Sequence, residues 1–108
     1  MAVVPALKWL NQRELGHLDC RVERSFEPGE YAVQLSLNGD SVTVIVPTSS
    51  VNVSGSLPAD GTLGVWLIAE LPESDPFYPG LLAELPAAPL NGTQRVKIKR
   101  AWLKDAPV

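Results

Sequence analysis

The chain has 108 residues, of which 45% are hydrophobic and 19% charged, with a formal net charge of -3 and a pI near 5.0. These proportions are those of an ordinary globular chain, and the length fits a single domain over residues 1–108. The acidic balance argues against a surface built as a whole to hold nucleic acid or anionic lipid, although it allows a local basic patch.

Cysteine usage and hydropathy give an expectation for the compartment. Cys20 is the only cysteine, so no disulfide can form within the chain. No apolar stretch approaches the roughly 20 residues that span a bilayer, and no basic segment precedes the apolar N-terminus. We therefore expect a cytoplasmic protein that does not enter a membrane.

Four dipeptides mark the places where tight β-turns are expected: Pro28-Gly29, Asn38-Gly39, Asp60-Gly61 and Asn91-Gly92. Glycine adopts positive φ freely and Asn or Asp tolerates it, which is what such turns require. Each pair stands beside a short run rich in Val, Leu and Ile. This pattern predicts a succession of antiparallel strands.

The first element in chain order is predicted to be a short helix over residues 5–15. Pro5 suits a first helical turn, apolar residues recur near a helical period, and Gly16 ends the pattern. Because an isolated helix of this length is marginal in water, Trp9 and Leu10 are expected to dock it on the sheet or to close one end of a barrel.

Residues 17–26 and 31–37 alternate apolar and polar side chains and predict two strands joined at Pro28-Gly29. In the first strand the apolar set runs from Leu18 to Phe26, and Arg24 breaks its parity. Either a bulge lies at Arg24 or the end of the strand leaves the core.

The middle of the chain predicts three further strands. Residues 41–46 complete a hairpin through Asn38-Gly39, and Val51 with Val53 fits a short edge strand after Pro47. Residues 62–71 are apolar on both faces, which places them at the centre of the sheet or under the helix.

The last third combines an irregular segment with one final strand. Half of the ten prolines lie between residues 72 and 89, where residues 81–85 fit a short edge strand or a helical turn. Residues 93–104 then form the last strand. The fold class expected is mainly β: a small antiparallel β-barrel of SH3-like or OB-like shape, or a compact sandwich, with five to six strands and a short N-terminal helix.

Catalytic chemistry has little support in the sequence. His17, Asp19 and Cys20 bring together a base, an acid and a nucleophile, but on a strand His17 and Cys20 point to opposite faces. Cys20 shares the parity of the buried set and is interpreted as a small core residue. No phosphate loop, dinucleotide fingerprint or metal-ligand spacing is present, so we expect no enzyme, no cofactor and no metal.

The final strand is unusually basic for an acidic chain. It holds five of the nine Lys and Arg residues: Arg95, Lys97, Lys99, Arg100 and Lys104. With Trp102 as a stacking platform, this patch would suit a single nucleic-acid strand. Alternatively, the cations keep an edge strand soluble and Trp102 belongs to the core.

Two adjacent aromatic residues between prolines form the second feature, Phe77 and Tyr78. Restricted loop flexibility would present them to a partner at a low entropy cost, as interfaces favour. The alternative is that they fold back as a lid over the barrel.

The function expected is a non-enzymatic binding or adaptor module that contacts another protein, or a second copy of itself. Single-stranded nucleic-acid binding is the alternative, and a structural or self-assembling subunit is the third hypothesis. The residues expected to bind the partner are Phe77, Tyr78, Arg95, Lys97, Lys99, Arg100 and Trp102.

Overall fold

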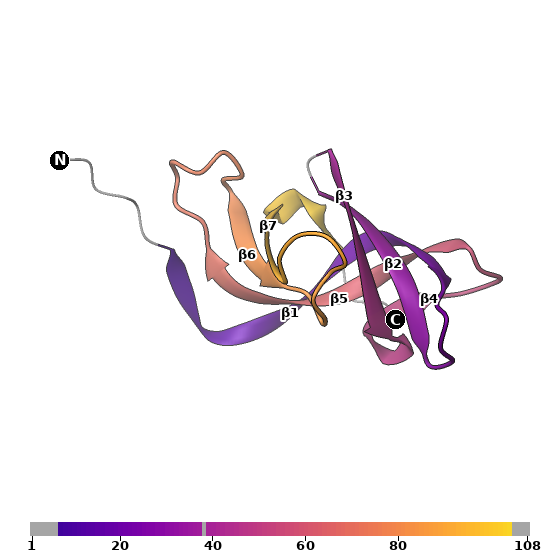
Figure 1. Cartoon of the computed structure of the whole chain (residues 1–108). Coiled ribbons are helices and arrows are strands. Elements are labelled where there is room, and N and C mark those ends of the chain that lie inside the picture. The colour runs from indigo at the N-terminus through magenta and orange to yellow at the C-terminus, as the bar shows by residue number, and fades with distance from the viewer. Residues whose placement is uncertain (1–6, 38, 105–108) are drawn as a thin grey trace.

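The computed structural model describes residues 7–37 and 39–104 (Figure 1). They form one antiparallel sheet of eight strands in the order β3-β2-β1-β5-β6-β7, with β4 added on β5 and β8 on β1. The strands are β1 (Lys8–Arg24), β2 (Glu30–Leu37), β3 (Asp40–Pro47), β4 (Val51–Val53), β5 (Ala59–Glu70), β6 (Gly80–Glu84), β7 (Arg95–Lys99) and β8 (Leu103–Lys104). The chain is thus mainly β, and the curled sheet is a half-barrel.

The two long strands β1 and β5 form the centre of this sheet. Their buried residues alternate with exposed ones from Leu18 to Val22 and with half-buried ones from Leu63 to Ala69. Because side chains on a strand alternate between faces, each strand contributes one face to the concave side. That side holds the core, which Val33, Leu85 and Ile98 complete from other elements.

The predicted helix over residues 5–15 is wrong. Residues 8–15 belong to β1, and Pro5 and Ala6 lie outside the described residues. β1 pairs with β5 at Trp9↔Ala69 and again at Glu14↔Leu67, so four residues of β1 oppose the single residue Ile68. This wide bulge shifts the parity of the strand and hides its two-residue period. No α-helix occurs in the described residues, and correspondingly none there could cross a membrane.

Most of the predicted strands are confirmed, with changes of length and place. β2 and β3 form the expected hairpin, in which Gly39 has φ 90°, whereas Asn38 lies outside the described residues. β4 is the short strand predicted after Pro47, and β5 lies between β1 and β6 as a central strand. Residues 80–84 form β6, but between β5 and β7 rather than at an edge. The final strand is divided into β7, a 3-10 turn (Arg100–Trp102) and β8.

Phe26 lies exposed in the turn between β1 and β2, contrary to the expectation from the sequence. Its side chain is 97% exposed instead of continuing the apolar face of β1. β1 ends at Arg24, where the parity breaks, so Phe26 lies in the turn outside the sheet. Of the two readings of Arg24, the structure therefore shows the strand end leaving the core.

The proline-rich segment before β7 reaches back to the edge strand β3. The backbone N–H of Leu90 donates to the carbonyl of Thr43 at 2.8 Å, and the Asn91 side chain bonds to Thr43 and Ser41. These residues are about 50 positions apart in the sequence. The contact ties the end strand β3 to the segment that leads into the other end strand, β7, and it bridges the open side of the half-barrel.

Candidate functional site

The loop between β5 and β6, residues 71–79, is held by its own hydrogen bonds. The carboxylate of Asp75 accepts the backbone N–H of Phe77 at 2.9 Å, and its carbonyl accepts the N–H of Tyr78 at 2.9 Å. The N–H of Leu71 donates to the carbonyl of Gly80 at 3.0 Å and closes the base of the loop. This local network fixes the backbone on both sides of the two aromatic residues.

Three contacts join this loop to β7 and to the 3-10 turn that follows. Lys97 Nζ lies 2.7 Å from Asp75 Oδ2, and the Phe77 ring meets the edge of the Trp102 ring at a centroid distance of 5.9 Å. The N–H of Arg100 donates to the carbonyl of Pro79 at 3.0 Å. The Asp75 side chain is only 9% exposed. The hydrogen bonds from Lys97 and from the Phe77 N–H lower the pKa of Asp75 below its ordinary value.

Tyr78 stands outside this packed set and is 49% exposed. Beside it lies a hollow of about 160 Å³, whose wall includes Glu70 and Arg100. Arg100 Nη2 is 3.5 Å from Glu70 Oε1, so the wall carries both a donor and an acceptor. We call Tyr78, Arg100 and Glu70 with the supporting Phe77 and Asp75 the Tyr78 surface.

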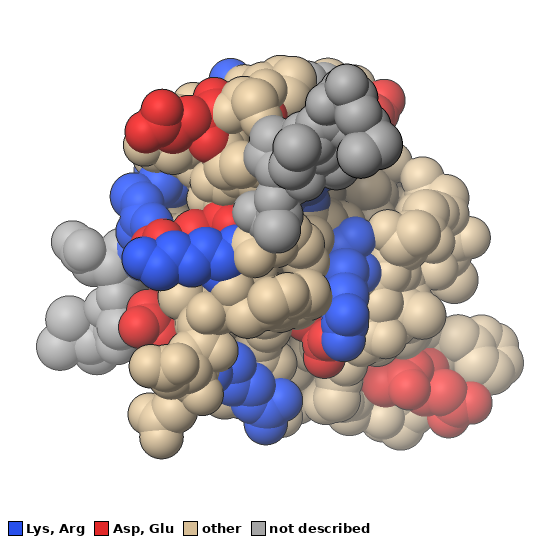
Figure 2. All heavy atoms as spheres, turned by 90° about the vertical axis from the view of Figure 1, so that its left-hand side faces the viewer, with Lys and Arg blue, Asp and Glu red and all other residues tan. Residues whose placement is uncertain are grey.

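Carboxylates accompany the basic residues of the C-terminal segment. The ion pairs are Arg95–Glu84, Lys97–Asp75, Arg100–Glu70 and Lys104–Asp19, at 2.7 to 3.5 Å. Lys99 instead lies over the Trp102 ring, 5.9 Å from its centre. Figure 2, which faces the end of the molecule where β1 begins, shows blue cations interspersed with red carboxylates rather than one basic field.

The structure brings most of the predicted site residues together. Phe77, Lys97, Lys99 and Trp102 form one connected cluster, with Tyr78 and Arg100 at its border. Arg95 lies at the opposite end of β7. The two aromatic residues behave differently. Phe77 packs on Trp102, as the lid alternative expects, and Tyr78 faces solvent, as presentation to a partner requires. Trp102 itself is half-buried and packs against the core.

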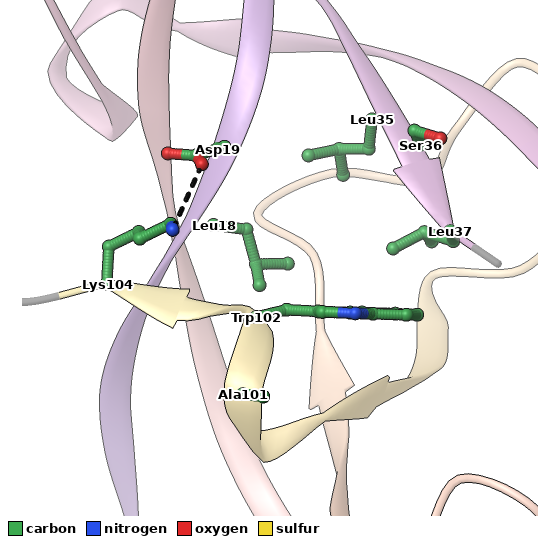
Figure 3. A pocket seen from close by; sticks show the side chains of 8 residues that line it. All are labelled: Leu18, Asp19, Leu35, Ser36, Leu37, Ala101, Trp102 and Lys104. Atoms are coloured by element: carbon green, nitrogen blue, oxygen red, sulfur yellow. Dashed lines mark ion pairs between the residues drawn. The ribbon is translucent and has the colours of Figure 1, made fainter.

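A second cavity lies where β1 and β2 separate (Figure 3). Their pairing ends at Arg21↔Gln34, and β8 takes over the edge of β1 at Leu18↔Leu103. The space left between β2 and β8 has a volume of about 250 Å³. Its walls include Leu18, Leu35, Leu37 and the Trp102 ring, and its rim carries the Asp19–Lys104 ion pair at 3.4 Å. We call this cavity the Trp102 pocket.

His17, Asp19 and Cys20 do not converge into a catalytic group. Cys20 lies buried in the core, whereas Asp19 is exposed on the opposite face of β1, which His17 shares by strand parity. Burial raises the pKa of the Cys20 thiol to about 11, and the nearby carboxylates of Asp19 and Asp60 add to the shift. Within residues 7–37 and 39–104, no three His, Cys, Asp or Glu side chains gather as metal ligands would.

Reasoning from the sequence missed the acidic half of these sites. The sequence does not single out Asp75 or Glu70, because the pairing of β6 with β7 that brings Lys97 and Arg100 to them is not visible in local patterns. It also missed the Trp102 pocket, since Leu18, Leu35 and Leu37 read as ordinary core positions. The broken parity at Arg24 was the one available signal that Phe26 leaves the sheet.

Comparisons with known proteins add no family to this description. The chain matches no protein-family model, no curated protein and no solved structure.

Proposed function

We propose that this chain is a non-enzymatic binding module that contacts another protein through the Tyr78 surface. The observation that carries the proposal is the half-exposed Tyr78 ring beside a small hollow, on a loop already fixed by Asp75 and by the Phe77–Trp102 contact. A binding residue that is held in place loses little freedom on association, and Tyr and Arg are frequent energetic centres of interfaces.

The size and chemistry of the hollow support a side chain as its occupant. Its volume of about 160 Å³ lies well below the roughly 300 Å³ at which ligand pockets begin. Arg100 and Glu70 at its wall would orient a polar or charged group of the partner. The raised pKa of the buried Cys20 thiol supports the non-enzymatic part of the proposal. Catalysis by a cysteine needs the thiolate, and a raised pKa keeps the thiol protonated.

A single nucleic-acid strand is the weaker candidate. Its phosphates would have to displace carboxylates already bound to Lys97, Arg100 and Lys104. We also propose that the half-barrel is related in shape to SH3-like or OB-like barrels, and that the protein is cytoplasmic. The unpaired Cys20 supports that location, since structural disulfides are rare in reducing compartments.

The test is affinity capture from an extract of the native host, with and without nuclease. The wild type, Tyr78→Ser and the control Leu15→Ser, which changes an exposed apolar residue on β1, are compared. We expect a protein retained by the wild type and by Leu15→Ser but lost with Tyr78→Ser, whether or not nuclease is added. Capture that Tyr78→Ser leaves unchanged, or that nuclease abolishes, would contradict the proposal.

A further inference from the structure

The turn between β1 and β2 carries an exposed aromatic ring in an acidic setting. Phe26 is 97% exposed. Glu23, Glu27 and Glu30 surround it in the sequence, with Arg24 as the one cation among them. An isolated exposed apolar residue needs no explanation by itself, so the inference depends on a matching site elsewhere.

The Trp102 pocket has the size and lining that a phenyl ring requires. Leu18 and Leu35, only 3% and 2% exposed, close its base, so the accessible apolar surface comes from the half-buried Leu37 and from the flat face of the half-buried Trp102 (Figure 3). An enclosed apolar cavity of roughly 150 Å³ is large enough to bind benzene, and the Trp102 pocket, which is open to solvent and has a polar rim, measures about 250 Å³. The pocket therefore has room for the ring and for part of the chain that carries it.

The charges beside the ring and beside the pocket are complementary. Lys104 stands on the rim of the pocket, and Lys99 lies over the Trp102 ring. Because Lys104 is already paired with Asp19, the net positive charge beside the pocket comes from Lys99. Glutamates dominate around Phe26, so the two sites attract each other and would orient an approaching molecule.

We propose that Phe26 of one copy of this chain inserts into the Trp102 pocket of a second copy. The two sites lie at opposite ends of β2: the strand begins at Glu30, just after the Phe26 turn, and ends at Leu37 in the pocket wall. Eight residues of strand separate them by about 25 Å, which prevents a contact within one chain. The association is head-to-tail and continues into a chain or closes into a ring.

The Trp102 ring that lines the pocket packs against Phe77 of the Tyr78 surface, but the inference does not require the Tyr78 surface to bind a partner. Since one ring and a few charges make a small interface, the association is weak and is best followed at rising protein concentration. Sedimentation of the full chain is expected to show species larger than a dimer. NMR is expected to show a concentration-dependent shift of the Trp102 indole N–H, assigned with Trp102→Phe.

Two kinds of variant should reduce the association constant by roughly tenfold or more. Phe26→Ser removes the ring, whereas Leu90→Ser, at another exposed apolar residue, is the matched control and should leave association unchanged. Leu37→Glu alters the pocket wall. Lys104→Glu alters only the exposed rim, so it tests the pocket even if Leu37→Glu fails to fold. A mixture of Phe26→Ser with a pocket variant has one intact ring and one intact pocket, and it should form a dimer and nothing larger.

Several results would overturn the inference. The inference is wrong if the wild type stays monomeric and its Trp102 indole N–H signal does not move with concentration. It is also wrong if Phe26→Ser still associates, or if the mixture of Phe26→Ser with a pocket variant forms no dimer. Association lost with Tyr78→Ser but not with Phe26→Ser would also reject it while supporting the Tyr78 surface. The two proposals can thus fail separately.

Discussion

The side chain of Asn91 makes the hydrogen bonds to Thr43 and Ser41 that the backbone of a neighbouring strand would make. Its Oδ1 accepts the Thr43 N–H at 3.1 Å, and its Nδ2 donates to the carbonyl of Ser41 at 2.9 Å. The N–H of Leu90 satisfies the Thr43 carbonyl. A loop thereby takes the place of a strand along β3, which protects an edge that would otherwise be open to pairing with another chain.

Replacing Asn91 should therefore weaken the closure of the half-barrel. We expect Asn91→Ala to lower the free energy of unfolding by about 1 kcal/mol, because two exposed hydrogen bonds are lost. Asn91→Asp keeps the acceptor for Thr43 but sets a carboxylate oxygen against the Ser41 carbonyl, so its loss should be at least as large. Urea denaturation measures both, and an Asn91→Ala variant as stable as the wild type would refute the role given to this side chain.

Gly80 is the point at which the loop of the Tyr78 surface enters β6. A Cβ added there would lie 2.5 Å from the carbonyl oxygens of both Ile98 and Phe77, so backbone would have to move. We expect Gly80→Ala to cost about 1–3 kcal/mol, as overpacking typically does. At Gly64 the nearest atom to such a Cβ is 3.4 Å away, and Gly64→Ala is the control with little effect. Equal stability of the two variants in thermal unfolding would contradict this prediction.

The ion pair of Asp75 with Lys97 should make stability depend on pH in the acid range. The pKa of folded Asp75 is lowered from 3.8, so its contribution is complete above that value and is lost as the pH falls through the folded pKa. The melting temperature of Asp75→Asn should lie below that of the wild type at pH 7, and the difference should shrink below about pH 4. A difference that is constant from pH 7 to pH 2 would exclude this linkage.

Cys20 should react slowly with alkylating reagents in the folded protein. Its pKa of about 11, against an ordinary 9.0, leaves about a hundredfold less thiolate at pH 8, and burial restricts access further. Labelling by iodoacetamide is expected to become fast only in denaturant. Native Cys20 that reacts as quickly as the unfolded thiol would reopen the question of a catalytic role.

The strands with regular parity were predictable from the sequence, and the reason is local. β2 and β3 alternate without interruption on both sides of Gly39, so their faces and their turn follow from neighbouring residues alone. β5 buries one face in the core and half-buries the other, and the apolar residues on both faces correctly predicted its central place in the sheet.

The elements that were mispredicted depend on contacts between distant residues. The first half of β1 is a strand because it pairs with β5, and the bulge opposite Ile68 disrupts the period that would have revealed it. For the candidate site, Tyr78, Arg100 and Trp102 could be named individually from residue type. Their contacts with Glu70 and Phe77 arise only when β6 places the loop beside β7, which no local pattern encodes.

The most direct test of the protein-binding proposal is photocrosslinking from position 78. The variant Tyr78→p-benzoylphenylalanine keeps an aromatic ring at the surface, and the same group at the exposed Ser49, in the 3-10 turn after β3, is the control. In host extract we predict a discrete protein adduct from position 78, absent from position 49 and abolished by adding Arg100→Glu. Equal adducts from both positions, or adducts with nucleic acid alone, would contradict the account.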